Sequence, residues 1–133
     1  MTIMPRRKTI RVLLCNRHNL FREGIKALFL KETVIRIVGE AATAGQALAL
    51  LQQLRPDVVL LDPNTVDSCG SEATRCMKAL HPHVAVLVLS LSDDDGLIEA
   101  CLAAGAAGYI RSADQPAQLR RAISSAYGAS HAA

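Results

Sequence analysis

Two short segments place polar and charged side chains directly after apolar runs. The run IRVLLC is followed by Asn16 and Arg17, and the run DVVLL is followed by Asp62 and, two residues later, Asn64. A carboxylate at the end of a buried strand is a candidate nucleophile, metal ligand or ion-pair partner. A guanidinium at the same sheet edge would attract that carboxylate and repel a metal ion. Metal-dependent chemistry at Asp62 therefore depends on whether the fold brings Arg17 beside it.

Five apolar runs of strand character alternate with five segments of helical periodicity, which predicts an α/β fold with a parallel sheet and right-handed crossovers. The first, third and fourth runs are nearly continuous, as in strands buried on both faces, whereas the second alternates polar and apolar residues, as in an edge strand. The predicted strands span residues 10–15, 34–41, 57–62, 84–90 and 107–111, and the predicted helices residues 19–30, 43–55, 71–80, 92–105 and 116–128.

Residues with capping preferences precede several of the predicted helices. Asn19 and Thr43 are predicted N-caps, Ser92 with Asp95 resembles a capping box, and Pro116 suits a first helical turn. The side chains expected to face the core are Phe21, Ile25, Leu28 and Phe29 in the first helix, Ala44, Ala47, Leu48 and Leu51 in the second, and Ala73, Met77 and Leu80 in the third.

The apolar strength of the first, third and fourth strands favours a doubly wound, flavodoxin-like sheet of order 2-1-3-4-5. In such a sheet ligands bind outside the carboxyl ends of the strands, at the switch point between strands 1 and 3. The residues expected around this cleft are Asn16, Arg17, Asp62 and Asn64, with Ser90 and Ser112 at its side.

Composition narrows the functional class. The 133 residues fit one domain, and the formal charge of +3 is accounted for by Arg6, Arg7 and Lys8 in a predicted flexible tail over residues 1–8. The body of the chain is neutral, and a basic tail alone is only a weak indication of direct nucleic-acid binding. Four irregularly spaced cysteines and the lack of any apolar run of membrane-spanning length predict a cytoplasmic protein with reduced thiols and no membrane partner.

Four blocks together resemble a known family: RVLLCNRHNLFREGIKALF, EAATAGQALALLQQLRPDVVLLD, SEATRCMKALHPHVAVLVLS and AAGAAGYIRSADQPAQLRRAI. In this order and spacing they are similar to the CheY-like receiver domain of bacterial two-component response regulators, most of all the NarL/FixJ branch. The resemblance implies a receiver domain over residues 9–128. It further implies that residues 129–133 form a tail or the start of a linker to a DNA-binding domain absent from the chain.

The resemblance gives roles to three residues. Asp62 matches the aspartate that accepts a phosphoryl group from a histidine kinase, Ser90 matches the hydroxyl residue that bonds the phosphoryl oxygen, and Tyr109 matches the aromatic switch residue of strand 5.

Three other positions depart from the family pattern. The acidic pair that helps to bind Mg²⁺ is replaced by Asn16 and Arg17, and the strand-5 lysine is replaced by Ser112. Because Mg²⁺ needs oxygen ligands with negative charge, its binding is predicted to be weak or lost, and no metal or other cofactor is expected. We expect Arg17 to stand in for the metal by pairing with Asp62, holding that carboxylate ionised and the cleft in one state.

The sequence thus predicts an atypical, non-enzymatic receiver that controls transcription through a helix-turn-helix output domain outside this chain, without Mg²⁺-dependent phosphorylation. Two alternatives stay open: a conventional phosphoacceptor switch at Asp62, and a receiver whose cleft binds a small anion or metabolite. The expected partners are a second copy of the chain, a histidine kinase or another regulatory protein, and DNA only through the output domain. His81 and His83 are interpreted as an exposed loop pair rather than a metal site.

Overall fold

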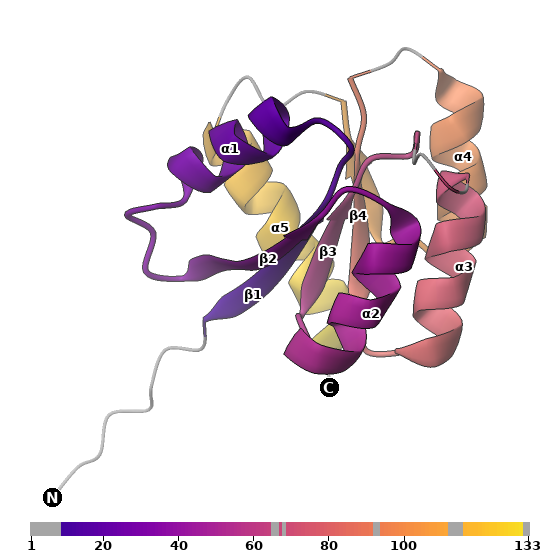
Figure 1. Ribbon diagram of the computed structural model, residues 1–133, viewed down its shortest axis with the longest axis horizontal. Helices are drawn as coiled ribbons and strands as arrows, with labels where there is room; N and C mark the ends of the chain where they lie inside the picture. The colour runs from indigo at the N-terminus through magenta and orange to yellow at the C-terminus, as the bar shows by residue number, and fades with distance from the viewer. Residues whose placement is uncertain (1–8, 65–66, 68, 92–93, 112–115, 132–133) are drawn as a thin grey trace, which may run out of the picture.

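The computed structural model describes residues 9–64, 67, 69–91, 94–111 and 116–131, in which five parallel strands form one sheet. The strand order is β2-β1-β3-β4-β5 (Figure 1), so the predicted α/β fold and its order are confirmed. The strands are β1 (Ile10–Cys15), β2 (Ile35–Ala41), β3 (Val58–Leu61), β4 (Ala85–Leu89) and β5 (Gly108–Ile110).

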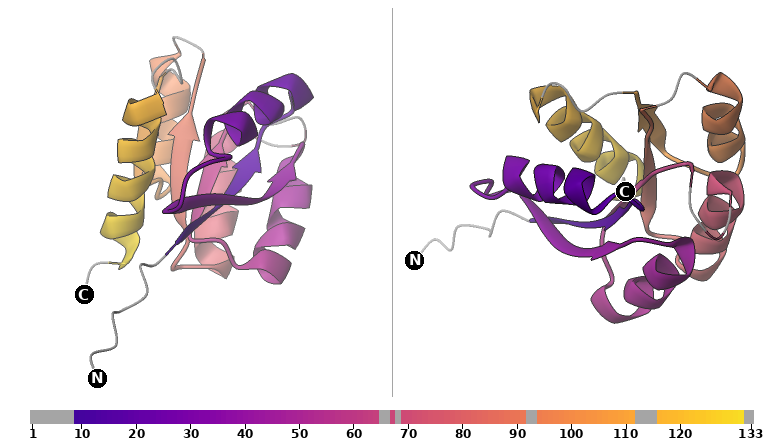
Figure 2. Two further views of the ribbon diagram at one scale, coloured as in Figure 1. Left: turned by 90° about the vertical axis from the view of Figure 1, so that its left-hand side faces the viewer. Right: turned by 45° about the horizontal axis from the view of Figure 1, so that its top comes forward.

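Helices cover both faces of the sheet. The first and last helices lie on one face, and the other three lie on the opposite face (Figure 2). Because all five strands are parallel, their carboxyl ends meet at one edge of the sheet. The helices are α1 (Asn19–Leu28), α2 (Ala44–Leu54), α3 (Gly70–Leu80), α4 (Asp95–Ala103) and α5 (Pro116–His131).

The central strand β1 shows why its sequence is continuously apolar. Val12 and Leu14 are buried under α1 and α5, while Leu13 and Cys15 are buried under α2 and α3. Because successive side chains of a strand point to opposite faces, a strand covered on both sides needs apolar residues at every position.

Two predictions about helix faces are wrong. Leu28 is 38% exposed and Leu80 is 66% exposed, although both were expected to face the core. Each is the last residue of its helix, so no following turn covers it. The buried face of each helix therefore ends one turn earlier, at Ile25 in α1 and at Met77 in α3, which are both buried.

The helix ends correct several predicted boundaries. Thr43 is confirmed as the N-cap of α2, because its Oγ1 accepts the N–H of Gln46 at 3.1 Å. Asn19, by contrast, is the first residue of α1 after the N-cap His18. For α4 the N-cap is Asp94, whereas Ser92 of the predicted capping box lies outside the described residues.

The last helix continues past its predicted end near Tyr127 and Gly128, to His131. A Cβ at Gly128 would meet nothing within 4 Å, so this glycine lies on an open helix surface. It lowers helix propensity by about 1 kcal/mol without forcing a turn, and the alanine-rich residues around it carry the helix on.

Candidate functional site

Asp62 lies directly after β3, at the carboxyl edge of the sheet. Its N–H donates to the carbonyl of Cys15 at the end of β1 at 2.9 Å, and its Oδ1 accepts the N–H of Asn64 at 2.9 Å. The half-buried carboxyl group borders a depression of about 110 Å³ that Asn16, Arg17 and Asn64 also line. The fold therefore gathers these four predicted site residues at the switch point between β1 and β3.

Arg17 does not pair with Asp62. Its side chain is exposed, and its Nε donates to Nε2 of the neighbouring His18 at 3.2 Å. Within the part of the chain that the structure describes, no ion pair joins Arg17 to Asp62. The predicted ion pair is wrong because the N–H of His18 donates to Oδ1 of Asn16 at 2.8 Å, an Asx-type turn after which Arg17 is directed to solvent.

The charge of Arg17 favours the ionised form of Asp62, as predicted, but it is not the largest influence on that carboxyl group. Burial raises the pKa of Asp62 above its usual value, and this outweighs three smaller influences. The N–H of Asn64 and the charges of Arg17 and His18 each lower that pKa, in this order of importance. Arg17 attracts the carboxylate, but burial has the larger influence on its pKa.

Both oxygen atoms of Asn16 accept hydrogen bonds. Its side-chain Oδ1 accepts from His18, and its main-chain carbonyl accepts from the guanidinium of Arg22 at 2.5 Å. The N–H of Asn16 also donates to the carbonyl of Ala41 at the end of β2, at 3.0 Å. The segment after β1 is therefore fixed by hydrogen bonds on both sides.

Arg22 is a structural residue of this site that the sequence did not reveal. Its side chain is only 12% exposed, and its Nε donates to Oε1 of Glu40 at 2.8 Å. The other carboxylate oxygen of Glu40 accepts from Lys26 at 2.5 Å. Hydrogen bonds from Lys26 and then from Arg22 lower the pKa of Glu40, despite some desolvation. The only sequence signal is the spacing of four between Arg22 and Lys26, which places both on one helix face.

Asp67, five residues after Asp62, is hydrogen-bonded to the N-terminus of α2. Its carboxylate accepts the N–H groups of Ala44 and Gly45, at 2.9 Å each, at the N-terminus of α2. These bonds, the one from Gly45 first, lower the pKa of Asp67. Because the contact joins residues more than 20 positions apart, no local sequence pattern predicts it.

Two further predicted residues, Ser90 and Tyr109, lie beside or in β5. Ser90 is fully buried after β4 and its N–H donates to the carbonyl of Ile110 at 2.9 Å. Tyr109 is 48% exposed, with the guanidinium carbon of Arg111 5.9 Å from its ring centre, and Arg111 forms an ion pair with Asp95 of α4. Ser112, the third predicted residue, lies outside the described residues.

A model of the family described as "Response regulator receiver domain" matches residues 12–124, which include the whole of this site. The chain belongs to the response regulator receiver domain family. This receiver domain is 37% identical over 101 residues to transcriptional regulatory protein DegU of Brevibacillus brevis, covering 76% of the chain and 43% of the relative. It is 34% identical over 114 residues to response regulator GacA of Pseudomonas viridiflava, covering 86% and 53%.

Solved structures agree with this assignment. A LuxR-family two-component response regulator from Aurantimonas sp. SI85-9A1 superposes with a TM-score of 0.84 at 30% identity, covering 92% of this chain and 87% of the other. The receiver domain of the putative response regulator NarL from Mycobacterium tuberculosis gives a TM-score of 0.83 at 27% identity, covering 90% and 97%.

The coverage of the relatives and the apolar character of the helices give two further facts about this receiver domain. The chain spans about half the length of the curated relatives it matches, 43% and 53% in the two cases above. Among the residues described, no helix is both long and apolar enough to cross a membrane.

Proposed function

We propose that this receiver domain is the regulatory part of an atypical LuxR/NarL-type response regulator, signalling by association rather than by Mg²⁺-dependent phosphorylation of Asp62. It catalyses no reaction, works in the cytoplasm and controls transcription through a helix-turn-helix output domain outside this chain. A second copy of the chain is the first expected partner. The observation that carries the proposal is the oxygen set of the cleft, in which Asp62 is the one carboxylate among the described lining residues.

The donor set does not fit a bound Mg²⁺. The ion demands near-octahedral oxygen coordination and is usually held by one or two carboxylates with phosphate and water. Here both oxygens of Asn16 accept intramolecular hydrogen bonds, and Arg17 lines the same depression. The positive charge of Arg17 disfavours a divalent ion there as well, although solvent screens an exposed guanidinium. These groups support weak or absent Mg²⁺ binding.

A phosphorylation assay tests the proposal directly. The protein is incubated with acetyl phosphate and Mg²⁺, and its intact mass is measured over time beside that of Asp62→Asn. We expect neither protein to gain a stable phosphoryl group, and size-exclusion chromatography to give the same oligomeric state with and without the phosphodonor. A stable gain in the natural sequence that Asp62→Asn abolishes would overturn the proposal.

That same outcome would support the second candidate, a conventional phosphoacceptor switch driven by a histidine kinase. One observation favours it: Arg17 is turned to His18, and therefore does not block the carboxylate of Asp62. In this case the phosphoryl group would also change the elution volume, because phosphorylation would then control association.

A further inference from the structure

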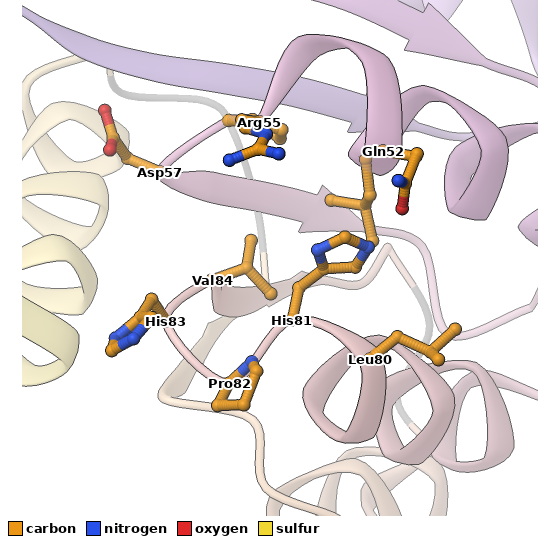
Figure 3. A pocket seen from close by; sticks show the side chains of 10 residues that line it. Gln52, Arg55, Asp57, Leu80, His81, Pro82, His83 and Val84 are labelled. Carbon is orange, nitrogen blue, oxygen red and sulfur yellow. The ribbon is translucent and has the colours of Figure 1, made fainter.

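A second pocket lies at the opposite end of the sheet from Asp62. It is enclosed by the C-terminal end of α2, the amino ends of β3 and β4, and the loop between α3 and β4 (Figure 3). Its volume of about 440 Å³ is within the range of small-molecule sites. It shares no lining residue with the depression at Asp62, and therefore the two sites can be tested independently.

Hydrogen-bond donors without protein partners surround this pocket. Figure 3 shows the guanidinium of Arg55 and the amide of Gln52, both from the end of α2, around one opening with the ring of His81 from the facing loop. Across the described ranges, none of these three side chains is hydrogen-bonded to another residue. The acidic residue of the pocket, Asp57, already accepts the N–H of Arg11 at 2.9 Å. The pocket therefore offers three side chains with donors that no protein group occupies among the described residues.

The backbone of Arg55 is unusual. This residue has φ 48° and ψ 59° and is the only described non-glycine residue with positive φ. It occupies the left-handed position after α2 that glycine usually fills, so a side chain is kept at the place where it is least favoured. The negative ends of the α2 and α3 dipoles stabilise the guanidinium there. Without Arg55, these dipoles would disfavour an anion at this place. Anion binding must therefore depend on the charge of Arg55.

Apart from His83, the rest of the lining is apolar. Leu51 and Val84 form a buried floor, and Leu80 and Pro82 are exposed beside His81. Apolar walls with a few converging donors are typical of pockets for small organic ligands.

We propose that this pocket binds a small organic monocarboxylate. Its carboxylate accepts hydrogen bonds from Arg55, Gln52 and His81, and its planar or branched apolar body packs on Leu80 and Pro82. Guanidinium and carboxylate are matched in charge and in the geometry of their two parallel hydrogen bonds.

Benzoate is the probe, and binding is followed by ¹H–¹⁵N NMR titration of the full chain. We expect saturable shifts confined to residues 51–57 and 80–84. Acetate, which lacks the ring, and benzamide, which lacks the charge, should each bind more weakly. Arg55→Gln should weaken benzoate binding by about tenfold or more, because a charge-assisted bidentate contact is lost. Arg75→Gln, which removes an exposed charge elsewhere on α3, and Asp62→Asn should leave it unchanged.

Leu80→Ser provides a second variant in which folding is not at risk, because this leucine is largely exposed. It should weaken benzoate binding and leave acetate binding unchanged. The proposal is overturned if benzoate gives no saturable shift, if benzamide binds as tightly, or if Arg55→Gln and Arg75→Gln have equal effects.

Discussion

Asp62 at the carboxyl end of the sheet and Arg55 at the amino end are opposite charges in opposite settings. At the carboxyl end Asp62 is half-buried, its Oδ1 is hydrogen-bonded and its pKa is raised by burial. At the amino end Arg55 is exposed and has no partner among the described residues. Helix N-termini face the first end and helix C-termini the second, so each charge complements the dipoles beside it. The helix dipoles thus favour both Asp62 and Arg55, whereas burial makes only the charge of Asp62 energetically costly.

The two ends also differ in what holds them. The segment after β1 is fixed to β2 by Arg22 and Glu40, and Asp67, which follows β3 in the chain, is hydrogen-bonded to α2. These are side-chain contacts between distant parts of the chain. The amino end has such contacts too, because Arg11 donates its N–H to Asp57 and its guanidinium to the carbonyl of Leu54, but it also contains the left-handed backbone of Arg55. Substitutions should therefore affect the two ends by different mechanisms.

The largest change should come from making the carboxyl end a cation site. Asn16→Asp combined with Arg17→Asp places three carboxylates around the depression and removes its guanidinium. We expect Mg²⁺ to bind about 1,000-fold more tightly than to the natural sequence. This factor is smaller than the one that the full change in charge would give at intermediate dielectric. Isothermal titration calorimetry measures this, with Arg75→Asp as a control that carries two of the three units of charge change away from the depression. Unchanged Mg²⁺ affinity would show that charge is not what limits the cleft.

The close packing beside Asp62 can be broken at Gly70. A Cβ there would lie 2.6 Å from Cα and 2.8 Å from the carbonyl oxygen of Pro63, both backbone atoms. Gly70→Ala should lower the free energy of unfolding by about 2–3 kcal/mol in urea titrations, as overpacking does. Gly24→Ala is the matched control, since nothing lies within 4 Å of its Cβ, and it should stabilise α1 by about 0.5–1 kcal/mol.

Two arginines near the depression should differ in their effect on stability. Arg22→Met leaves the carbonyl of Asn16 and one oxygen of Glu40 without their donor, and should cost about 2 kcal/mol in urea unfolding. Arg17→Met removes an exposed side chain and should change stability by about 0.5 kcal/mol or less. Equal costs would contradict the view that Arg22, rather than Arg17, fixes this segment.

At the amino end, stability and ligand binding should move in opposite directions. Arg55→Gly relieves the left-handed backbone and should raise the free energy of unfolding by about 0.5–1 kcal/mol, while abolishing benzoate binding. Arg75→Gly, in the interior of α3, should instead destabilise by about 1 kcal/mol. Destabilisation by Arg55→Gly would mean that its side chain serves the fold rather than a ligand.

The smallest effect should be at Asp62 itself. Because burial raises its pKa in the folded protein, ionisation opposes folding, and the associated stability is present below the unfolded pKa and lost as pH rises through the folded one. Asp62→Asn should therefore stabilise the protein by about 0.5 kcal/mol at pH 7, with solvent screening limiting the gain. The difference should vanish near pH 3 in thermal unfolding followed by circular dichroism. Destabilisation at pH 7 would contradict a raised pKa.

Hydrophobic patterning was sufficient to predict the strand order and the edge at which the site lies. Continuous apolar runs require strands covered on both faces, and parallel strands bring the residues after β1 and β3 to one edge. Asn16, Arg17, Asp62 and Asn64 could therefore be grouped without coordinates, and the family blocks gave Asp62 its expected role.

Only the tertiary structure decided which of these side chains interact. Attraction between opposite charges predicts a pair between Arg17 and Asp62, but the hydrogen bond from His18 to Asn16 directs Arg17 to solvent. Arg22, an unremarked helical residue in the sequence, becomes the fixed cation because Glu40 of a neighbouring strand faces it. Sequence determines which groups reach an edge of the sheet, while hydrogen bonds and burial that depend on distant residues determine how each one points and titrates.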